Sequence, residues 1–206
     1  MSSTANVTGG RSASGEACEA PQWRSRRAES AILQTTVALL GEVGFSGLTI
    51  DGIAARAGVG KATIYRHWSS KAEVAVEAFK AFIPPLDDPD TGSFADDVRA
   101  VLLQIIDGLT NSPLAGILPS LVEAAERDAE LERLFKEFGR GRRAVLRAVF
   151  DRAAARGELR DGLEPDVAID ALVGPIFTRR LITRAPVTRK HVNAVLDLVL
   201  PVLQRG

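Results

Sequence analysis

The side chains with the clearest chemical potential lie close together, in segment 60–71, which reads GKATIYRHWSSK. Lys61 carries a cation that can donate hydrogen bonds to a phosphate or to the acceptor atoms of guanine. Ala62 and the methyl group of Thr63 can contact a thymine methyl group, and Tyr65 can donate one hydrogen bond without bringing a charge. These groups suit the recognition of double-stranded DNA rather than bond-breaking chemistry.

Other kinds of site fit the sequence poorly. Gly58-Val59-Gly60-Lys61-Ala62-Thr63 looks like the end of a phosphate-binding loop, but Ala55 stands where the first glycine should be and Ala62 replaces the magnesium-binding hydroxyl. His67 and His191 are far apart and lie near no cysteine, so they suggest neither a metal site nor a catalytic triad. We therefore expect no enzyme activity, no catalytic residues, no metal and no cofactor.

Two short helices joined by a tight corner must position the side chains of segment 60–71. Thr49 can cap a helix that begins at Ile50, and Gly58 can end that helix because glycine tolerates the positive φ of a sharp turn. The second helix is expected over residues 61–67, and its N-terminus presents free N–H groups and the positive end of a dipole. The pattern predicts a helix-turn-helix with a core formed by Ile53, Val59, Ile64 and Trp68.

The segment from Arg24 to Phe79 resembles the DNA-binding domain of the tetracycline-repressor (TetR) family. The residues that carry the resemblance are Ala31-Ile32-Leu33, Gly44-Phe45, Leu48-Thr49-Ile50, Ile53-Ala54, Ala57-Gly58-Val59, Thr63-Ile64-Tyr65, Trp68 and Lys71. The resemblance implies base-edge or sugar-phosphate contacts for Gly60, Lys61, Ala62 and Thr63. It implies mainly phosphate contacts for Thr49, Tyr65, His67 and Lys71.

Two positions depart from the common pattern of this family. Gly60 stands where a Ser or Thr often caps the recognition helix, and Arg66 occupies an exposed position that is often uncharged, where it can add a phosphate contact. A purely structural alternative stays open for four side chains, with Thr49 only a cap, Tyr65 and Trp68 only core, and Lys71 only the start of a helix.

Charge is concentrated around the expected helix-turn-helix, although the chain of 206 residues has a formal net charge of zero. Residues 24–71 contain seven Lys or Arg and three acidic residues, a local net charge of +4. Such a segment suits the DNA backbone, and a solvated basic face is the alternative. Cys18 is the single cysteine and no apolar run could span a bilayer, so we expect a cytoplasmic protein without disulfides or membrane contact.

The chain divides into three parts where its composition changes. Residues 1–23 are rich in Ser, Gly, Ala and Thr and are expected to form a flexible tail. Its Arg11 and the later Arg24, Arg26 and Arg27 could reach DNA as an arm, and a leader that contacts nothing is the alternative. Residues 24–83 are expected to form the DNA-binding domain, with supporting helices at 25–43, ended by Gly44, and at 71–82. Pro84-Pro85 and the acidic run after them mark the boundary with a helical domain at 84–206.

Proline and capping residues mark the helices of the second domain. Ser93 with Asp96 resembles a capping box, Ser112-Pro113 opens a helix that Pro119 should kink, and residues 128–156 form the longest periodic segment. Further helices are expected from Pro165, with a kink at Pro175, and from Thr188 to Gln204. The sequence therefore predicts an all-α chain of about nine helices, and the carboxylate pairs Asp87/Asp88 and Asp96/Asp97 are expected to be solvated.

The apolar stripes of the second domain admit three uses, as core, as dimer interface or as ligand pocket. The residues expected at a dimer interface are Val173, Phe177, Leu181, Val195, Val199 and Leu203. Those expected to line an effector pocket are Leu102, Ile106, Leu118, Val122, Phe135, Phe138 and Phe177, with Glu123, Arg142 or Thr178 as polar selectors.

We expect a homodimeric transcriptional regulator, a repressor that leaves a palindromic operator when a small hydrophobic or amphipathic effector binds. Two copies set about one turn of DNA apart, ~34–36 Å, double the few base pairs that one helix-turn-helix reads. The alternatives are a regulator that responds to a protein partner, an activator, and an α-helical enzyme with an incidental helix-turn-helix.

Overall fold

The computed structural model describes residues 22–111 and 116–205, and within these ranges the chain is helical. Nine α-helices and one short π-helix follow one another there, together with one isolated bridge between Leu159 and Gln204. The predicted all-α class with nine helices is confirmed. The flexible tail was expected over residues 1–23. Residues 1–21, which include Arg11 and Cys18, lie outside the described residues, and residues 22 and 23 begin the first helix.

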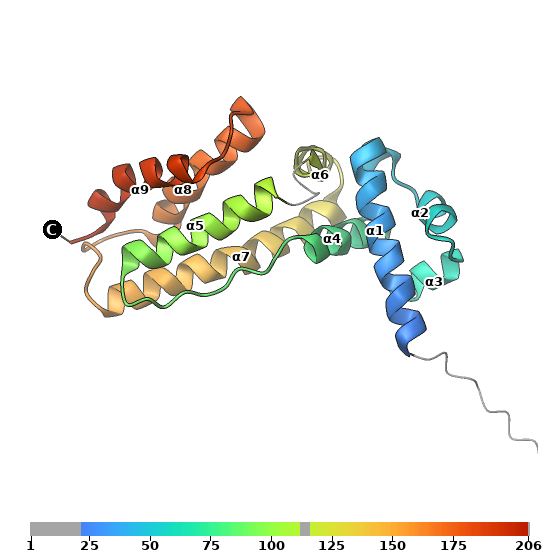
Figure 1. The fold of residues 1–206 in the computed structure, drawn as a ribbon, viewed down its shortest axis with the longest axis horizontal. Coiled ribbons are helices and arrows are strands. Elements are labelled where there is room, and N and C mark those ends of the chain that lie inside the picture. The colour runs from blue at the N-terminus through green and yellow to red at the C-terminus, as the bar shows by residue number, and fades with distance from the viewer. Residues whose placement is uncertain (1–21, 112–115, 206) are drawn as a thin grey trace, which may run out of the picture.

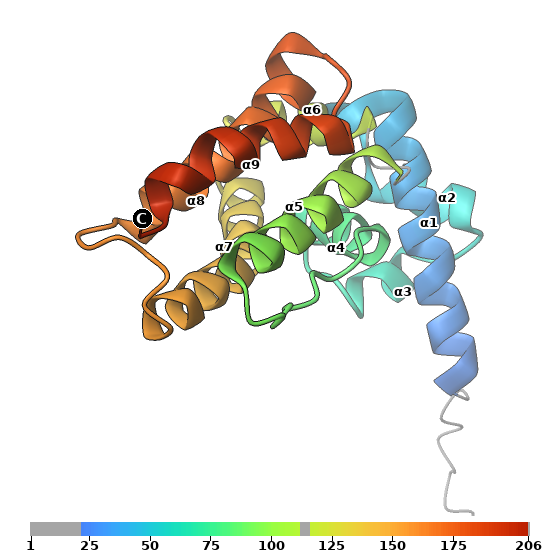
Figure 2. The ribbon, with the colours of Figure 1, turned by 60° about the vertical axis from the view of Figure 1, so that its left-hand side comes forward.

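The helices form two groups that meet where α4 packs on α7 and where α1 packs on α6 (Figure 1). The first group comprises α1 (Gln22–Gly47), α2 (Ile50–Ala57), α3 (Lys61–Tyr65) and α4 (Lys71–Phe82). The second comprises α5 (Phe94–Thr110), α6 (Leu118–Ala125), α7 (Ala129–Ala155), α8 (Pro165–Phe177), the π-helix η2 (Thr178–Thr183) and α9 (Arg189–Leu203). Helices α2 and α3 lie at one end of the molecule and α9 lies toward the other (Figures 1 and 2).

Side-chain caps begin most of these helices where the sequence predicts them. Thr49, Ser93 and Thr188 each accept a hydrogen bond from a backbone N–H in the following turn, which satisfies a donor that the helix itself cannot pair. Ser70 and Asp128 cap α4 and α7 in the same way. At the other end of α2, Gly58 has a φ of 67° and donates its N–H to the carbonyl of Ala54, as the expected corner requires.

Several helix boundaries differ from the predictions. The helical assignment of α1 continues to Gly47, although Gly44 interrupts it with a φ of 66° and a ψ of −178°. The recognition helix α3 ends at Tyr65 rather than at His67. The predicted kink at Pro119 is wrong, because Pro119 lies in the first turn of α6, where a missing N–H breaks no helical hydrogen bond. Residues Ser112 and Pro113 lie outside the described residues.

Glycine and proline disturb the longer helices less than their types suggest. Helix α7 runs unbroken through Gly139 and Gly141. Pro175 lies inside α8, and the chain passes into the π-helix η2 three residues later, at Thr178. A proline removes one backbone donor from a helix, and a local change of hydrogen-bond spacing is a common response.

One hydrophobic core runs through both groups of helices. Phe79 of α4 contacts Phe135 and Phe138 of α7, with ring centroids 5.2 and 5.5 Å away. The opposite side of α4 packs against α1. Helix α4 therefore belongs to both groups, and the division of the chain at residues 83 and 84 remains a proposal about domains rather than a break in the core.

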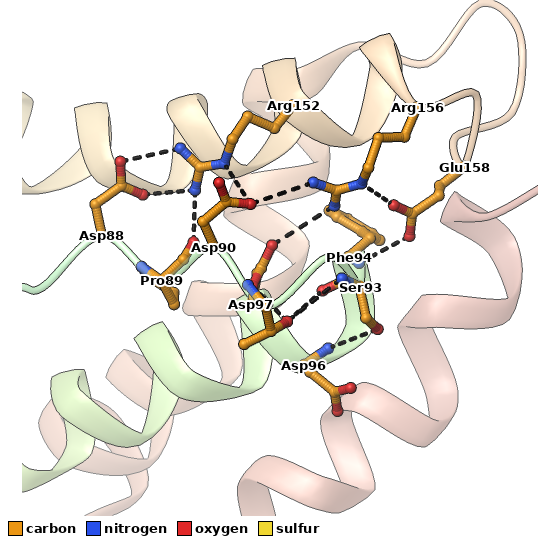
Figure 3. A network of polar contacts seen from close by, with 11 residues as sticks. Asp88, Pro89, Asp90, Ser93, Phe94, Asp96, Asp97, Arg152, Arg156 and Glu158 are labelled. Carbon is orange, nitrogen blue, oxygen red and sulfur yellow. Dashed lines mark hydrogen bonds and ion pairs between the residues drawn. The ribbon is translucent and has the colours of Figure 1, made fainter.

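The segment between α4 and α5 is held on α7 by a polar network (Figure 3). Arg152 donates to both carboxylate oxygens of Asp88, at 3.0 and 2.6 Å, and to the carbonyl of Pro89 at 2.6 Å. Arg156 pairs with Glu158 and lies 3.5 Å from Asp97. The connecting segment is thus an anchored strap rather than a free linker.

The expected solvation of the two carboxylate pairs is wrong for Asp97. Asp97 is fully buried, where it accepts hydrogen bonds from the N–H and the hydroxyl of Thr91 at 2.8 and 2.7 Å. Asp88 stays exposed as expected, although Arg152 of α7 also binds it, and that pairing depends on how α7 lies against this segment. Asp96 fits the prediction better, since it stays exposed and meets only Arg99 at 3.5 Å.

Candidate nucleic-acid interface

Helices α2 and α3 pack into a compact helix-turn-helix through their inward-facing apolar side chains. Ile53 and Ile64 are completely buried and Trp68 is 5% exposed, so the expected core is present, with Val59 packed at its edge. The backbone of Gly60 begins α3 in an extended conformation and supplies no side-chain cap, which matches the departure seen in the sequence. Because the inner face of α3 is buried against α2, its outer face remains exposed and can meet a partner.

The structure brings the predicted DNA-contact residues together on that outer face. Gly60, Lys61, Ala62, Arg66 and His67 are exposed, Tyr65 is 54% exposed, and Thr63 is half-buried. Tyr65 is therefore not a core residue, in contrast to Trp68. Thr49 is also exposed, and its hydroxyl oxygen accepts the N–H of Gly52 at 3.0 Å, which leaves its own O–H proton able to reach a phosphate.

Lys61 is already paired. Its Nζ forms an ion pair with Asp51 of α2, and this hydrogen bond raises the pKa of the Lys61 ammonium group above its ordinary value. Both side chains are more than half exposed, so the pair is weak in water and a phosphate can compete for the cation. This pairing could not be predicted from helical periodicity, because Asp51 and Lys61 lie on different helices.

Lys71 has a structural task in addition to its expected one. Its Nζ donates to the carbonyl of Phe45 at 3.1 Å and lies 4.3 Å from the centroid of the Phe45 ring. Lys71 therefore ties the start of α4 to the end of α1. It is half-buried whereas Arg66 is exposed, so the cation of Lys71 is less accessible to a phosphate than that of Arg66.

Other basic residues of the DNA-binding unit are also exposed. Arg26 and Arg27, which were expected to reach DNA as part of an arm, are exposed on α1, and Arg56 of α2 donates to Glu42 of α1 at 2.5 Å. The hydrogen bond to Arg56 lowers the pKa of Glu42. The local excess of basic residues is thus partly balanced by cross-helix pairs, and Arg26, Arg27 and Arg66 keep exposed side chains.

A cavity of about 360 Å³ lies between α4, α5, α6, α7 and α8. Five of the residues proposed for a pocket line it, namely Leu118, Phe135, Phe138, Arg142 and Phe177. Leu102 and Ile106 do not, because they are buried elsewhere in the core, and Val122, Glu123 and Thr178 are exposed outside it. Phe79 and Ile83 line the cavity unpredicted, since the sequence assigned α4 to the DNA-binding unit alone.

The side chains chosen for a dimer interface need correction. Val195 and Leu203 are buried within the protomer, Leu181 and Val199 are half-buried against its core, and Val173 and Phe177 line the cavity. The outward faces of the same elements carry other apolar groups. Val167 of α8 is 68% exposed, Ile182 of η2 is 77% exposed, and Leu198 and Val202 of α9 are 77% and 56% exposed.

Metal-binding and membrane-spanning features are missing from the part of the chain that the structure describes. No group of three or more His, Cys, Asp or Glu side chains is placed to hold a metal ion across residues 22–111 and 116–205. In the same ranges, every helix is too short or too polar to cross a bilayer.

The chain is similar over most of its length to bacterial regulatory proteins. Residues 32–78 match the family profile described as bacterial regulatory proteins, tetR family, and residues 88–199 match the tetracyclin repressor-like C-terminal domain. The HTH-type transcriptional regulator YdeS of Bacillus subtilis (strain 168) is 36% identical over 179 residues, which make up 86% of this chain and 88% of YdeS.

Solved structures have the same fold. The TetR family transcription regulator SCO0332 superimposes with a TM-score of 0.67 at 30% identity, over 85% of this chain and 98% of that one. The transcriptional regulator FadR from Bacillus subtilis, solved in complex with stearoyl-CoA, has a TM-score of 0.70 at 21% identity, over 84% of this chain and 98% of FadR. At that identity the likeness to FadR concerns the fold.

Proposed function

Since the chain belongs to the TetR family of DNA-binding transcriptional regulators, we propose that it is a homodimeric repressor that a small effector releases from a palindromic operator. It is a regulator and not an enzyme. The observation that carries the proposal is the exposed face of α3, with its cation, its small side chains and the Tyr65 hydroxyl at the surface. Because its proposed target is chromosomal DNA, we propose that the protein acts in the cytoplasm.

Within this proposal, α3 enters the major groove by its N-terminal end. Lys61, Ala62 and Thr63 then face base edges, and the roles of Thr49, Tyr65, Arg66, His67 and Lys71 are to fix the helix against phosphates. Gly60 adds no side chain at the tip of α3, which allows the backbone to approach the DNA closely.

The proposed dimer forms through the outward faces of α8, η2 and α9. Ala194, Leu198, Pro201 and Val202 are exposed at helical spacing along α9. Val167 and Ala171 continue an apolar surface on α8. A water-exposed apolar surface on neighbouring helices is a common sign of an interface, and a second copy related by a two-fold axis would cover it with the same surface.

The proposed effector site is the cavity beside α4. Phe79 and Ile83 of α4 line it, and the other side of α4 packs on α1, which supports α2 and α3. A molecule in the cavity can therefore favour one position of α4 over another and change the spacing of the two recognition helices. FadR, a protein of the same fold, was solved in complex with stearoyl-CoA, which supports an apolar or amphipathic effector for this chain.

The proposal is tested by titrating the full chain into a labelled fragment of the DNA upstream of its own gene, with fluorescence anisotropy at several salt concentrations. We expect two protomers per site, a steep fall of affinity with salt, and weak binding to a scrambled fragment of equal length. Transcription from the bound promoter should fall when the protein is added. A rise would favour the activator, and equal affinity for both fragments would contradict the proposal.

A further inference from the structure

The cavity beside α4 has a mostly apolar wall, and one cation on that wall has no carboxylate partner among the described residues. Its wall is built largely from Phe79, Phe135, Phe138, Leu146 and Ile169. Its volume of about 360 Å³ lies within the range of ~300–1,000 Å³ that is usual for small-molecule sites. Arg142 and Arg143 of α7 are the charged side chains on this wall among the described residues, and their surroundings differ sharply.

Arg143 is neutralised by acids of α8. It donates to Asp170 at 2.6 Å, to the carboxylate of Asp166 at 3.3 Å and to the backbone carbonyl of Asp166 at 2.6 Å. The hydrogen bond to Asp170 raises the pKa of Arg143. Its charge is therefore already used to hold α7 to α8.

Arg142 has no carboxylate partner within residues 22–111 and 116–205. Its Nη1 donates to the backbone carbonyl of Pro84 at 2.9 Å, and its guanidinium carbon lies 5.6 Å from the centroid of the Phe138 ring. Glu137 lies in the adjoining hollow but is paired with Arg133 at 3.7 Å. Burial lowers the pKa of Arg142, although an arginine stays protonated at neutral pH.

The position of Arg142 links the cavity to the end of α4. Arg142, Ile83 and Phe138 also form part of a second, more open hollow, so the guanidinium lies where the cavity meets the surface. Pro84, whose carbonyl Arg142 binds, directly follows Ile83, the C-cap residue of α4. An anion at this place would meet a guanidinium whose present acceptor is an uncharged carbonyl.

We propose that the effector is an amphiphile whose apolar part fills the cavity and whose anionic head binds Arg142 in place of the Pro84 carbonyl. This inference rests on the proposed effector site. A carboxylate or sulfate can accept two charge-assisted hydrogen bonds from one guanidinium, and such bonds are stronger than a bond to a neutral carbonyl. Loss of the Pro84 contact frees the end of α4, which packs on α1 and thereby reaches the DNA-binding helices.

The test is calorimetric titration of the full chain, without DNA, with four probes that share a ten-carbon chain: decanoate, decyl sulfate, decanol and decyltrimethylammonium. The ionic probes are kept below their micelle concentrations and decanol below its solubility limit. We expect both anions to bind at least about tenfold more tightly than decanol, and the cation to bind most weakly. Similar affinities for decanoate and decanol, or no binding by any of the four, would overturn the proposal. Comparing the four head groups requires no mutation of the protein.

Variants at two nearby positions of α7 locate the selectivity. Arg142→Met should abolish the preference for anions and leave the affinity for decanol within about twofold, and Arg142→Lys should keep part of the preference. Arg140→Met removes the same charge two residues away, at an exposed position outside the cavity wall, and should keep the full preference. A preference that survives in a folded Arg142→Met protein, as judged by circular dichroism, would overturn the assignment.

A second readout follows the end of α4. Amide hydrogen exchange in the peptide that contains Ile83 and Leu86 should accelerate when decanoate binds and stay unchanged with decanol. Unchanged exchange with bound decanoate would overturn the displacement of Pro84. Because these measurements omit DNA, failure of the anion preference leaves operator binding by α3 intact, and failure of operator binding leaves the anion preference intact.

Discussion

Lys61 on the tip of α3 is held in an ion pair by Asp51 of α2, so the cation expected to meet DNA is shared with an acid of the protein itself. In a complex, either the pair opens and Lys61 turns to a phosphate or base, or Asp51 remains close to the DNA backbone. Both outcomes make Asp51 unfavourable for binding, because it competes for the cation and repels phosphate.

Replacing Asp51 by Asn should therefore strengthen operator binding. We expect about a twofold to fivefold gain at low salt, which fades as salt rises, since exposed ion pairs are weak and screened. Anisotropy titrations at two salt concentrations measure the effect. Glu42→Gln, which frees Arg56 instead, serves as a comparison farther from α3, and weaker binding by Asp51→Asn would show that Asp51 positions Lys61 rather than competing for it.

Lys71→Met should affect both stability and DNA binding. It removes the hydrogen bond to the Phe45 carbonyl and the contact with the Phe45 ring, and we expect a loss of about 1 kcal/mol in the free energy of unfolding. Operator and scrambled DNA should both bind more weakly by a similar factor. Lys61→Ala and Thr63→Ala should instead change the preference between sequences, and an equal change in preference for Lys71→Met would contradict its proposed phosphate role.

Leu198→Glu should convert the dimer to a monomer. The substitution places a charge on the apolar outer face of α9, where a second copy is proposed to pack. Light scattering during size-exclusion chromatography gives the mass, and operator affinity should fall at least tenfold. Val43→Glu changes another exposed apolar side chain, on α1, and should leave the mass of the dimer unchanged. A dimer that persists in Leu198→Glu would place the interface elsewhere.

The strap on α7 should make stability depend on pH in the acid range. The hydrogen bond from Arg152 lowers the pKa of Asp88, so its contribution is present above the unfolded pKa of about 4 and is lost as pH falls through the lower folded value. Asp88→Asn should remove this contribution. Thermal melting between about pH 2 and 5 should show a flatter pH profile for Asp88→Asn than for the parent, and identical profiles would deny the pair a role.

Local chemistry predicts much of this fold. Thr49 and Gly58 define α2 because a cap and a left-handed corner are properties of single residues, and Ser93 and Thr188 act in the same way. The sequence alone does not show which of two apolar faces of a helix is buried. Helix α9 carries Val195 and Leu203 inward and Leu198 and Val202 outward, and only packing against α5 distinguishes the two sets.

Contacts between segments that are far apart in the sequence account for the features that were not predicted. The pairing of Asp51 with Lys61, the hold of Arg152 on Asp88 and the contribution of Ile83 to the cavity all depend on how helices cross. Helical periodicity identifies which side chains share a face but not which neighbour covers that face. For the same reason Leu102 fits a pocket in the sequence yet lies wholly within the core.

If the exposed face of α3 reads DNA, two single substitutions on that face should each lower operator affinity. Lys61→Ala and Tyr65→Phe alter exposed side chains whose loss should leave the thermal melting temperature unchanged. We expect each to weaken operator binding severalfold to tenfold in an anisotropy titration. If both bind the operator as tightly as the parent protein, α3 does not lie in the groove as proposed.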